Sequence, residues 1–91
     1  MNKQIYVFYD ARPLIQSVKA YLCEIIKYTK TGFKIKNIDE PGEYEDVIFK
    51  SDGTARGWRT LSWLSVYDIQ AQSDYKILRE RMRRDEAATA N

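Results

Sequence analysis

The segment from residue 10 to residue 32 most constrains the fold of this chain, because its apolar residues recur at helical spacing. The stripe is formed, at intervals of three and four residues, by Leu14, Val18, Leu22 and Ile25. Apolar residues at these intervals lie on one face of an α-helix, while the polar residues between them face solvent. The periodicity therefore predicts one long amphipathic helix that packs against the rest of the domain.

Both ends of this segment carry residues that are typical of helix ends. Asp10 precedes a first turn that contains Pro13, and a carboxylate at that position can accept an unpaired backbone N–H group. Lys27 and Lys30 lie in the last turns, where positive charge complements the negative end of a helix. Gly32 follows, and glycine can end a helix in a left-handed conformation.

Other segments have the composition of β-strands. Residues 4–9 are rich in aromatic and β-branched side chains, and residues 33–38 alternate apolar and lysine side chains. A Pro-Gly pair marks residues 39–43 as a turn, after which residues 44–50 are predicted to form a further strand. We expect these strands to pair in an antiparallel sheet.

The Asp52-Gly53 pair is typical of a type I′ hairpin turn, whose two central residues both need positive φ. Residues 56–60 would return as the partner strand and complete an antiparallel meander. Residues 61–72 fit either a helix or a further strand. Their β-branched and aromatic side chains favour a strand over residues 65–70.

Ser73 or Asp74 is expected to cap a last helix. The apolar face of this helix consists of Tyr75, Leu78 and Met82. Residues 87–91 are expected to form a frayed C-terminal tail. The chain is therefore predicted to belong to the α+β class, with residues 1–86 as a single domain. A small antiparallel sheet of three to five strands would carry the long amphipathic helix, with a further C-terminal helix.

Composition excludes several classes of function. The 91 residues include 15 Lys and Arg, 13 Asp and Glu, no histidine and one cysteine. Such a chain cannot supply a zinc site built from His and Cys, a disulfide, or a Ser-His or Cys-His nucleophile pair. We therefore expect no enzymatic activity, no metal site and no cofactor.

The N-terminal apolar run covers only residues 5–9, too short for a secretory signal, and no run is long enough to cross a membrane. Cys23 lies in an apolar stretch, where a lone cysteine usually serves as a small buried hydrophobic residue. These features favour the reducing cytoplasm, without membrane contact.

An acidic turn is the first candidate partner-binding site. Five carboxylates fall within eight positions: Asp39, Glu40, Glu43, Glu45 and Asp46. Their spacing lacks the alternating Asp/Asn pattern of a calcium loop. They form either a solvated surface loop or a patch of negative charge that competes for a basic surface on another protein.

The alternative site combines basic and aromatic side chains, which can contact phosphates and stack on bases. It consists of Arg56, Trp58, Arg59, Trp63 and Tyr67. On one continuous strand the two tryptophans would lie on opposite faces, so we expect at least one of them in the core. No sequence signature of a common nucleic-acid-binding domain is present.

Part of the chain, residues 52–75, resembles a family of small phage proteins. The matching residues are Asp52-Gly53, Trp58, Ser65, Asp68-Ile69-Gln70-Ala71 and Asp74-Tyr75. They are similar to the C-terminal pattern of proteins that antagonise the Thoeris defence system by sequestering its nucleotide signal, with Tyr75 in place of the family's tryptophan. The resemblance implies a non-enzymatic role against a host defence.

We therefore expect a small interaction module, an accessory inhibitor from a phage or mobile element. It would bind and block a host defence protein, a nucleic-acid-handling protein or a nucleoprotein complex. Aromatic residues and arginine contribute much of the energy of such interfaces. The alternative is a module that binds a nucleotide signal or single-stranded RNA or DNA. A homodimer would suit a core of this size.

Overall fold

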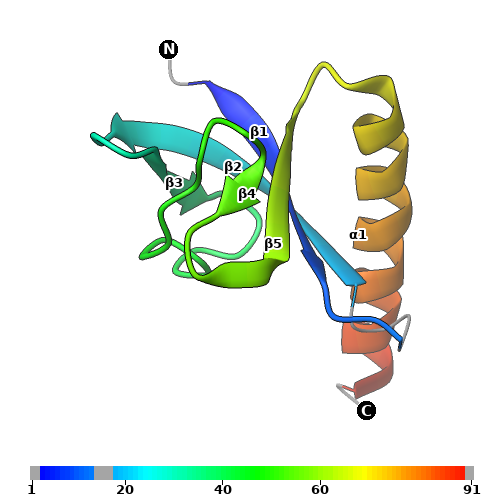
Figure 1. Cartoon of the computed structure of the whole chain (residues 1–91). Helices are drawn as coiled ribbons and strands as arrows, with labels where there is room; N and C mark the ends of the chain where they lie inside the picture. Colours follow the sequence, from blue (N-terminus) through cyan, green and yellow to red (C-terminus); the bar gives the residue numbers. More distant parts are fainter. Residues whose placement is uncertain (1–2, 14–17, 90–91) are drawn as a thin grey trace.

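Figure 1 shows a computed structural model of the chain, which describes residues 3–13 and 18–89. Within these residues the chain forms one antiparallel sheet and one helix. The elements are β1 (Gln4–Asp10), β2 (Val18–Tyr28), β3 (Phe33–Asn37), β4 (Thr54–Ala55), β5 (Trp58–Ser65) and α1 (Ile69–Thr89). The strands lie in the order β3-β2-β1-β5-β4. The predicted α+β class, the antiparallel sheet and the strands near residues 4–9 and 33–38 are confirmed.

The two edge strands of the sheet approach each other at Phe49. Phe33 in β3 exchanges two backbone hydrogen bonds with Phe49, at 2.8 and 2.9 Å. Phe49 also bridges to Ala55 in β4. The sheet therefore curls until its edges meet through this one residue (Figure 1).

The core fills the inside of the curled sheet. Its fully buried side chains include Ile5, Val7, Cys23, Ile35 and Phe49, which confirms the expected burial of Cys23. Among the described residues, Asn37 is the one buried polar side chain. Its amide group donates to the Glu43 carbonyl at 3.2 Å, and its oxygen accepts the Glu40 N–H at 2.9 Å. These bonds attach the acidic turn to the core.

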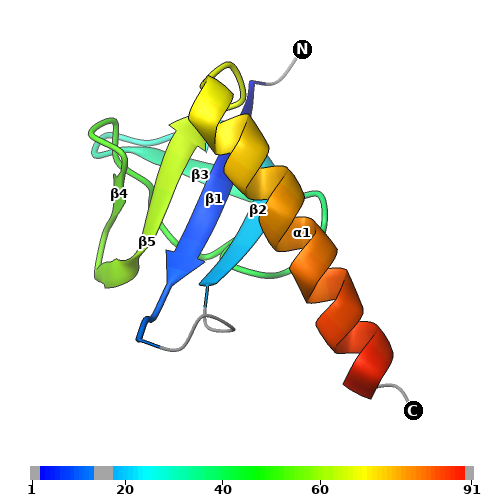
Figure 2. The same cartoon turned by 90° about the vertical axis from the view of Figure 1, so that its right-hand side faces the viewer.

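Helix α1 packs on the outer face of the sheet and crosses β1 and β2 (Figure 2). Leu78 and Met82 face the sheet and are buried. The ring of Tyr75 stacks on that of Tyr6, with 4.6 Å between the centroids. The described residues contain one helix at the C-terminal end, which carries Tyr75, Leu78 and Met82 towards the sheet, in place of the two helices predicted.

The start of α1 differs from the prediction. Its N-cap is Asp68, not Ser73 or Asp74, because the Asp68 carboxylate accepts the N–H of Ala71 at 2.9 Å. The strand expected over residues 65–70 is therefore wrong, since β5 ends where that segment begins and a helix starts four residues later.

At its other end, α1 continues to Thr89. Residues 87–89 of the expected frayed tail are helical, and residues 90–91 lie outside the described part of the chain. Of the described segments, α1 included, none is a helix with the length and apolar character required to cross a membrane.

The long helix expected over residues 10–32 is wrong. Residues 18–28 form β2, and residues 14–17 lie outside the described part of the chain. Tyr21, Cys23 and Ile25 point into the core, while Ala20 on the opposite face is buried on the side of α1. A strand that is covered on both faces is a nearly continuous apolar run, and such a run also contains residues at helical spacing.

Two residues expected at the ends of that helix have other roles. The Asp10 carboxylate accepts the Arg12 N–H at 3.2 Å and pairs with its guanidinium at 2.6 Å, so it closes a turn after β1. Gly32 lies between β2 and β3 without a left-handed φ. A Cβ atom there would overlap the carbonyl oxygen of Phe49, so Gly32 permits a close approach of two backbone segments.

The middle of the chain is less regular than predicted. Residues 41–46 form turns, so the strand expected over residues 44–50 contributes only the bridge at Phe49. The Asp-Gly turn is present, but only Gly53 has a positive φ, of 90°. This geometry fits a type I turn followed by a glycine bulge, not a type I′ turn. The return strand expected over residues 56–60 is confirmed in part, because β5 begins within it.

Candidate functional site

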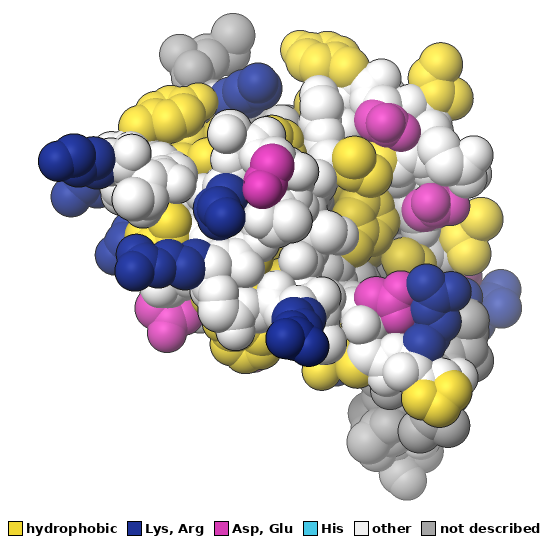
Figure 3. Space-filling view, viewed as in Figure 1, with side chains coloured by type: hydrophobic (Ala, Val, Ile, Leu, Met, Phe, Trp, Pro, Cys, Tyr) yellow, Lys and Arg dark blue, Asp and Glu magenta, His cyan; other side chains and the backbone are white. Residues whose placement is uncertain are grey.

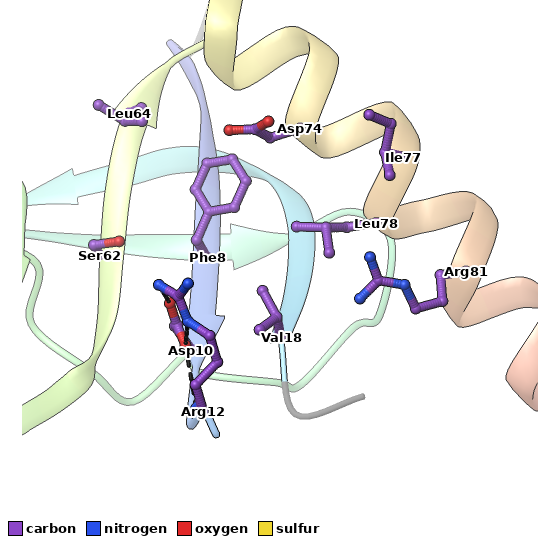
Figure 4. A pocket seen from close by; sticks show the side chains of 10 residues that line it. All are labelled: Phe8, Asp10, Arg12, Val18, Ser62, Leu64, Asp74, Ile77, Leu78 and Arg81. Atoms are coloured by element: carbon purple, nitrogen blue, oxygen red, sulfur yellow. Dashed lines mark hydrogen bonds and ion pairs between the residues drawn. The ribbon is translucent and has the colours of Figure 1, made fainter. Parts of the chain in front are cut away.

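A groove of about 360 Å³ lies on the outer face of the sheet, between β5 and α1 (Figure 4). Phe8 from β1, Leu64 from β5 and Leu78 from α1 supply apolar walls. The register pairs Leu64 with Tyr6 and Ser62 with Phe8, so these side chains share the outer face. The groove exists because α1 crosses β1 and β2 and leaves this part of β5 uncovered.

Two apolar side chains of the groove are exposed to solvent. Leu64 is 43% exposed and Ile77, on α1, is 58% exposed. Phe8 lies between the two elements and is half-buried. Exposed apolar side chains that gather in a concave surface are typical of binding sites.

The charged side chains around the groove balance one another. Two acids and two bases line it: Asp10, Asp74, Arg12 and Arg81. Hydrogen bonds from Arg12 lower the pKa of the Asp10 carboxyl. The Gln70 side-chain amide donates to Asp74 at 3.0 Å. The groove therefore has an apolar centre and a polar border without net charge.

The acidic turn is held in place by Asp39. Its Oδ2 atom accepts the Leu22 N–H and the Tyr75 hydroxyl, each at 2.7 Å. The Arg79 Nε atom lies 3.7 Å from the same oxygen. Two effects raise the pKa of Tyr75 above its ordinary range: burial, which is the larger, and the hydrogen bond to Asp39. Asp39 thus joins the turn to β2 and α1.

Glu45 also has a structural role. Its Oε2 atom accepts the N–H groups of Gly42, at 2.9 Å, and Asn37, at 3.1 Å, and these bonds lower the pKa of Glu45. The other carboxylates are half-buried or exposed: Glu40, Glu43 and Asp46. Within the described residues, no three acidic or cysteine side chains are grouped so that they could hold a metal ion. Two of the five predicted partner-binding residues therefore hold the turn in shape.

The predicted basic and aromatic residues do not form one face. Trp63 packs against the core: its indole N–H donates to the Lys50 carbonyl at 2.6 Å, and its ring lies edge-on to Phe33 at 5.2 Å between centroids. The expectation of at least one tryptophan in the core is met only in part, because Trp63 is half-buried at the edge of the core. The other four are exposed: Arg56, Trp58, Arg59 and Tyr67.

Trp58 belongs to an aromatic cluster that the sequence did not indicate. The Tyr44 ring centroid lies 6.3 Å from that of Tyr9, 5.6 Å from Tyr21 and 5.8 Å from Trp58. The Tyr44 backbone is left-handed, with φ of 61°, which is rare for an aromatic residue. Burial raises the pKa of Tyr21 and Tyr44. The four rings come from separate segments, so no periodicity in the sequence connects them.

The groove was not predicted either. The ambiguity over residues 61–72 left Leu64 without an assigned face. Ile77 is the residue from which the groove could have been predicted. It lies outside the apolar face predicted for the last helix. An isoleucine on the opposite, solvent-facing part of a helix raises the question of what covers it.

The residues that resemble the Thoeris anti-defence proteins have local structural roles. The Asp52 carboxylate accepts the Thr54 N–H at 3.0 Å, and the Ser65 hydroxyl accepts the Tyr67 N–H at 3.1 Å. Asp68 caps α1. The shared pattern thus corresponds to a turn, a strand end and a helix start.

Comparison with known proteins gave no match. Neither a scan against protein-family models nor searches of curated proteins and of solved structures matched this chain. The surfaces of the molecule are therefore the basis on which a function can be proposed.

Proposed function

We propose that this chain is a small non-enzymatic interaction module that binds a protein partner in the groove between β5 and α1. The observation that carries the proposal is the exposure of Leu64 and Ile77 beside Phe8 in a concave surface. The occupant is an amphipathic segment of the partner protein, which inserts apolar side chains between β5 and α1.

The charges around the groove favour a neutral, apolar occupant over a charged small molecule. Asp10 and Arg12 neutralise each other at 2.6 Å, and Asp74 and Arg81 carry opposite charges. An apolar centre with a polar border is the common anatomy of protein interfaces. A nucleotide would instead need several donors or cations directed at its phosphates.

The size of the groove supports the same occupant. Its volume of about 360 Å³ lies at the lower end of the roughly 300–1,000 Å³ that is usual for ligand pockets. One or two apolar side chains of a partner fit this space, and the exposed surfaces of β5 and α1 on either side can contact the rest of the segment.

In the cell, the module acts as an accessory inhibitor from a phage or mobile element that blocks a host defence protein or a nucleic-acid-handling protein. Its small size and its lack of histidine support a binding role. Cys23 is free and buried, and burial raises its pKa to about 12, which suits a reducing cytoplasm. Glu43 and Asp46 add secondary contacts at the acidic turn.

The test is selection of binding peptides from a random display library. Peptides selected on the unaltered chain should share two closely spaced apolar residues. Their affinity, measured by fluorescence anisotropy, should fall at least about tenfold on Leu64→Glu or Ile77→Glu, because each change places a charge in the apolar centre. Ile26→Glu is the matched control, since Ile26 is 53% exposed on β2 and does not line the groove.

Two outcomes would overturn the proposal. One is peptides whose binding is equally strong on Leu64→Glu, Ile77→Glu and Ile26→Glu. The other is a stable dimer in light scattering that Ile77→Glu dissociates, because the groove would then be covered by a second copy. Circular dichroism should establish that all three variants remain folded.

A further inference from the structure

The hairpin formed by β2 and β3 concentrates positive charge. Residues 25–38 contain four lysines and no acidic residue, although the whole chain has a formal net charge of only +2. In Figure 3, Lys and Arg side chains gather beside hydrophobic ones on the left of the view, where this hairpin lies, away from α1. This cluster of lysines was not predicted from the sequence. The helix expected over residues 10–32 would not have placed Lys27 opposite Lys34 in a hairpin.

Two of these lysines face each other directly. The register of β2 and β3 pairs Lys27 with Lys34. Like charges opposite each other on neighbouring strands destabilise a sheet. Within the described part of the chain, no acidic side chain forms an ion pair with Lys27, Lys30 or Lys34. Lys36 differs, because Glu24 lies opposite it. The fold thus tolerates an uncompensated cluster of three charges.

An exposed aromatic side chain lies at the end of the same hairpin, on the face opposite Lys27 and Lys34, because the register pairs Tyr28 with Phe33. Tyr28 is 69% exposed, yet its ring lies against Phe33 with 6.1 Å between the centroids. The turn is fixed as well: the Thr29 N–H donates to the Gly32 carbonyl at 2.8 Å. Tyr28 is therefore held by a buried neighbour and offers much of its ring to solvent.

We infer that the hairpin tip, defined as Lys27, Tyr28, Lys30 and Lys34, binds single-stranded nucleic acid. The nucleic acid passes around the end of the hairpin: the three lysines contact its phosphates, and Tyr28, on the other face, provides a surface on which a base stacks. Binding that does not depend on sequence combines positive charge with an exposed ring, and here the two lie on the two faces of one hairpin end. This site differs from the predicted set around Trp58 and Trp63.

The same charges could attract an anionic membrane, but the apolar side chains favour nucleic acid. A peripheral membrane site adds several apolar side chains that enter the interface beside its lysines. At the hairpin tip the exposed apolar side chains are Tyr28 and the single aliphatic residue Ile26. A stacking platform needs one ring, whereas membrane anchoring needs more apolar surface than these two residues supply.

The first measurement is the salt dependence of binding to a fluorescent oligothymidylate of about 15 nucleotides. Three neutralised phosphates predict a slope of about −2 for the logarithm of the affinity against that of the salt concentration. The affinity should therefore fall about 20-fold between 50 and 200 mM salt. The double variant Lys27→Gln/Lys34→Gln should leave a fall of only about threefold.

Matched variants separate the hairpin tip from net charge and from exposed aromatic surface in general. Lys19→Gln/Lys76→Gln removes two exposed lysines elsewhere and changes the net charge equally, so its slope should match that of the unaltered chain. Tyr28→Ala should weaken binding about 5- to 100-fold without changing the slope, since stacking releases no counterions. Tyr67→Ala, at a tyrosine that is 83% exposed near α1, should leave the affinity unchanged.

Equal slopes for the two double-lysine variants would overturn the inference. So would an oligonucleotide that does not bind at 50 mM salt. Binding of the chain to vesicles of phosphatidylcholine with a quarter phosphatidylserine, in place of the oligonucleotide, would assign the hairpin tip to membranes and overturn it too. Groove variants such as Ile77→Glu leave the hairpin tip intact, so these outcomes are independent of the proposed protein partner.

Discussion

Gly32 sets how closely two backbone segments approach where the sheet closes. Three other glycines, Gly42, Gly53 and Gly57, have positive φ, and each occupies a conformation that side chains disfavour. The constraint at Gly32 is steric instead, because a Cβ atom would overlap the Phe49 carbonyl and approach the Ile48 side chain. Phe49 is the residue that joins the two sheet edges, so a displacement there affects the closure directly.

Gly32→Ala is therefore expected to lower the free energy of unfolding by about 1–3 kcal/mol, the usual cost of forcing extra atoms into a packed site. Thr31→Ala, at the exposed preceding residue, should change it by less than about 0.5 kcal/mol. Urea denaturation followed by circular dichroism would measure both. Equal midpoints for the two variants would show that the turn can move away from Phe49 at no cost.

At the scale of whole elements, the sequence predicts best those strands that expose one face. Lys34 and Lys36 point outwards from β3 between buried residues, so the alternation is visible in the sequence. In β2 the alternation of apolar and polar residues is not visible around Tyr21 and Cys23. The reason is that the core covers one face of the strand and α1 covers the other. The same tertiary contact created the groove, which explains why neither could be derived from local periodicity.

Two substitutions near the start of α1 test whether Asp68, and not the cap position predicted from the sequence, stabilises the helix. Asp68→Ala removes the carboxylate that accepts the Ala71 N–H, and should destabilise the chain by about 1 kcal/mol. Asp74→Ala, at a cap position expected from the sequence, removes only a hydrogen bond from Gln70 within the helix and should cost less than about 0.5 kcal/mol. Thermal unfolding would compare them. A larger loss for Asp74→Ala would contradict the observed cap.

At the scale of the whole molecule, the small net charge conceals surfaces of different character. The groove lies between β5 and α1 and balances its charges, whereas the hairpin tip lies away from α1 and carries three uncompensated lysines. The two proposed ligands, a protein partner and a nucleic acid, would therefore bind separate surfaces and would not compete with each other. This arrangement would suit a target that is itself a nucleoprotein complex.

Carboxylates that accept hydrogen bonds determine how stability responds to acid. Backbone hydrogen bonds from Gly42 and Asn37 lower the pKa of Glu45 from its ordinary value of 4.5. Hydrogen bonds from Arg12 and Thr54 lower the pKa of Asp10 and Asp52 from 3.8. The folded chain keeps these groups charged at a pH where the unfolded chain binds protons. Their contribution is thus complete above the ordinary values and is lost as the pH falls through the lowered ones.

The melting temperature is therefore expected to stay level from about pH 7 to pH 5 and to fall progressively below about pH 4. Glu45→Gln should melt at a lower temperature than the unaltered chain at pH 7, and the difference should shrink at pH 3, because protonation weakens the same hydrogen bonds. Glu43→Gln, at an exposed position of the same turn, should follow the unaltered chain throughout. A constant difference between Glu45→Gln and the unaltered chain across this range would mean that the charge of Glu45 does not stabilise the turn.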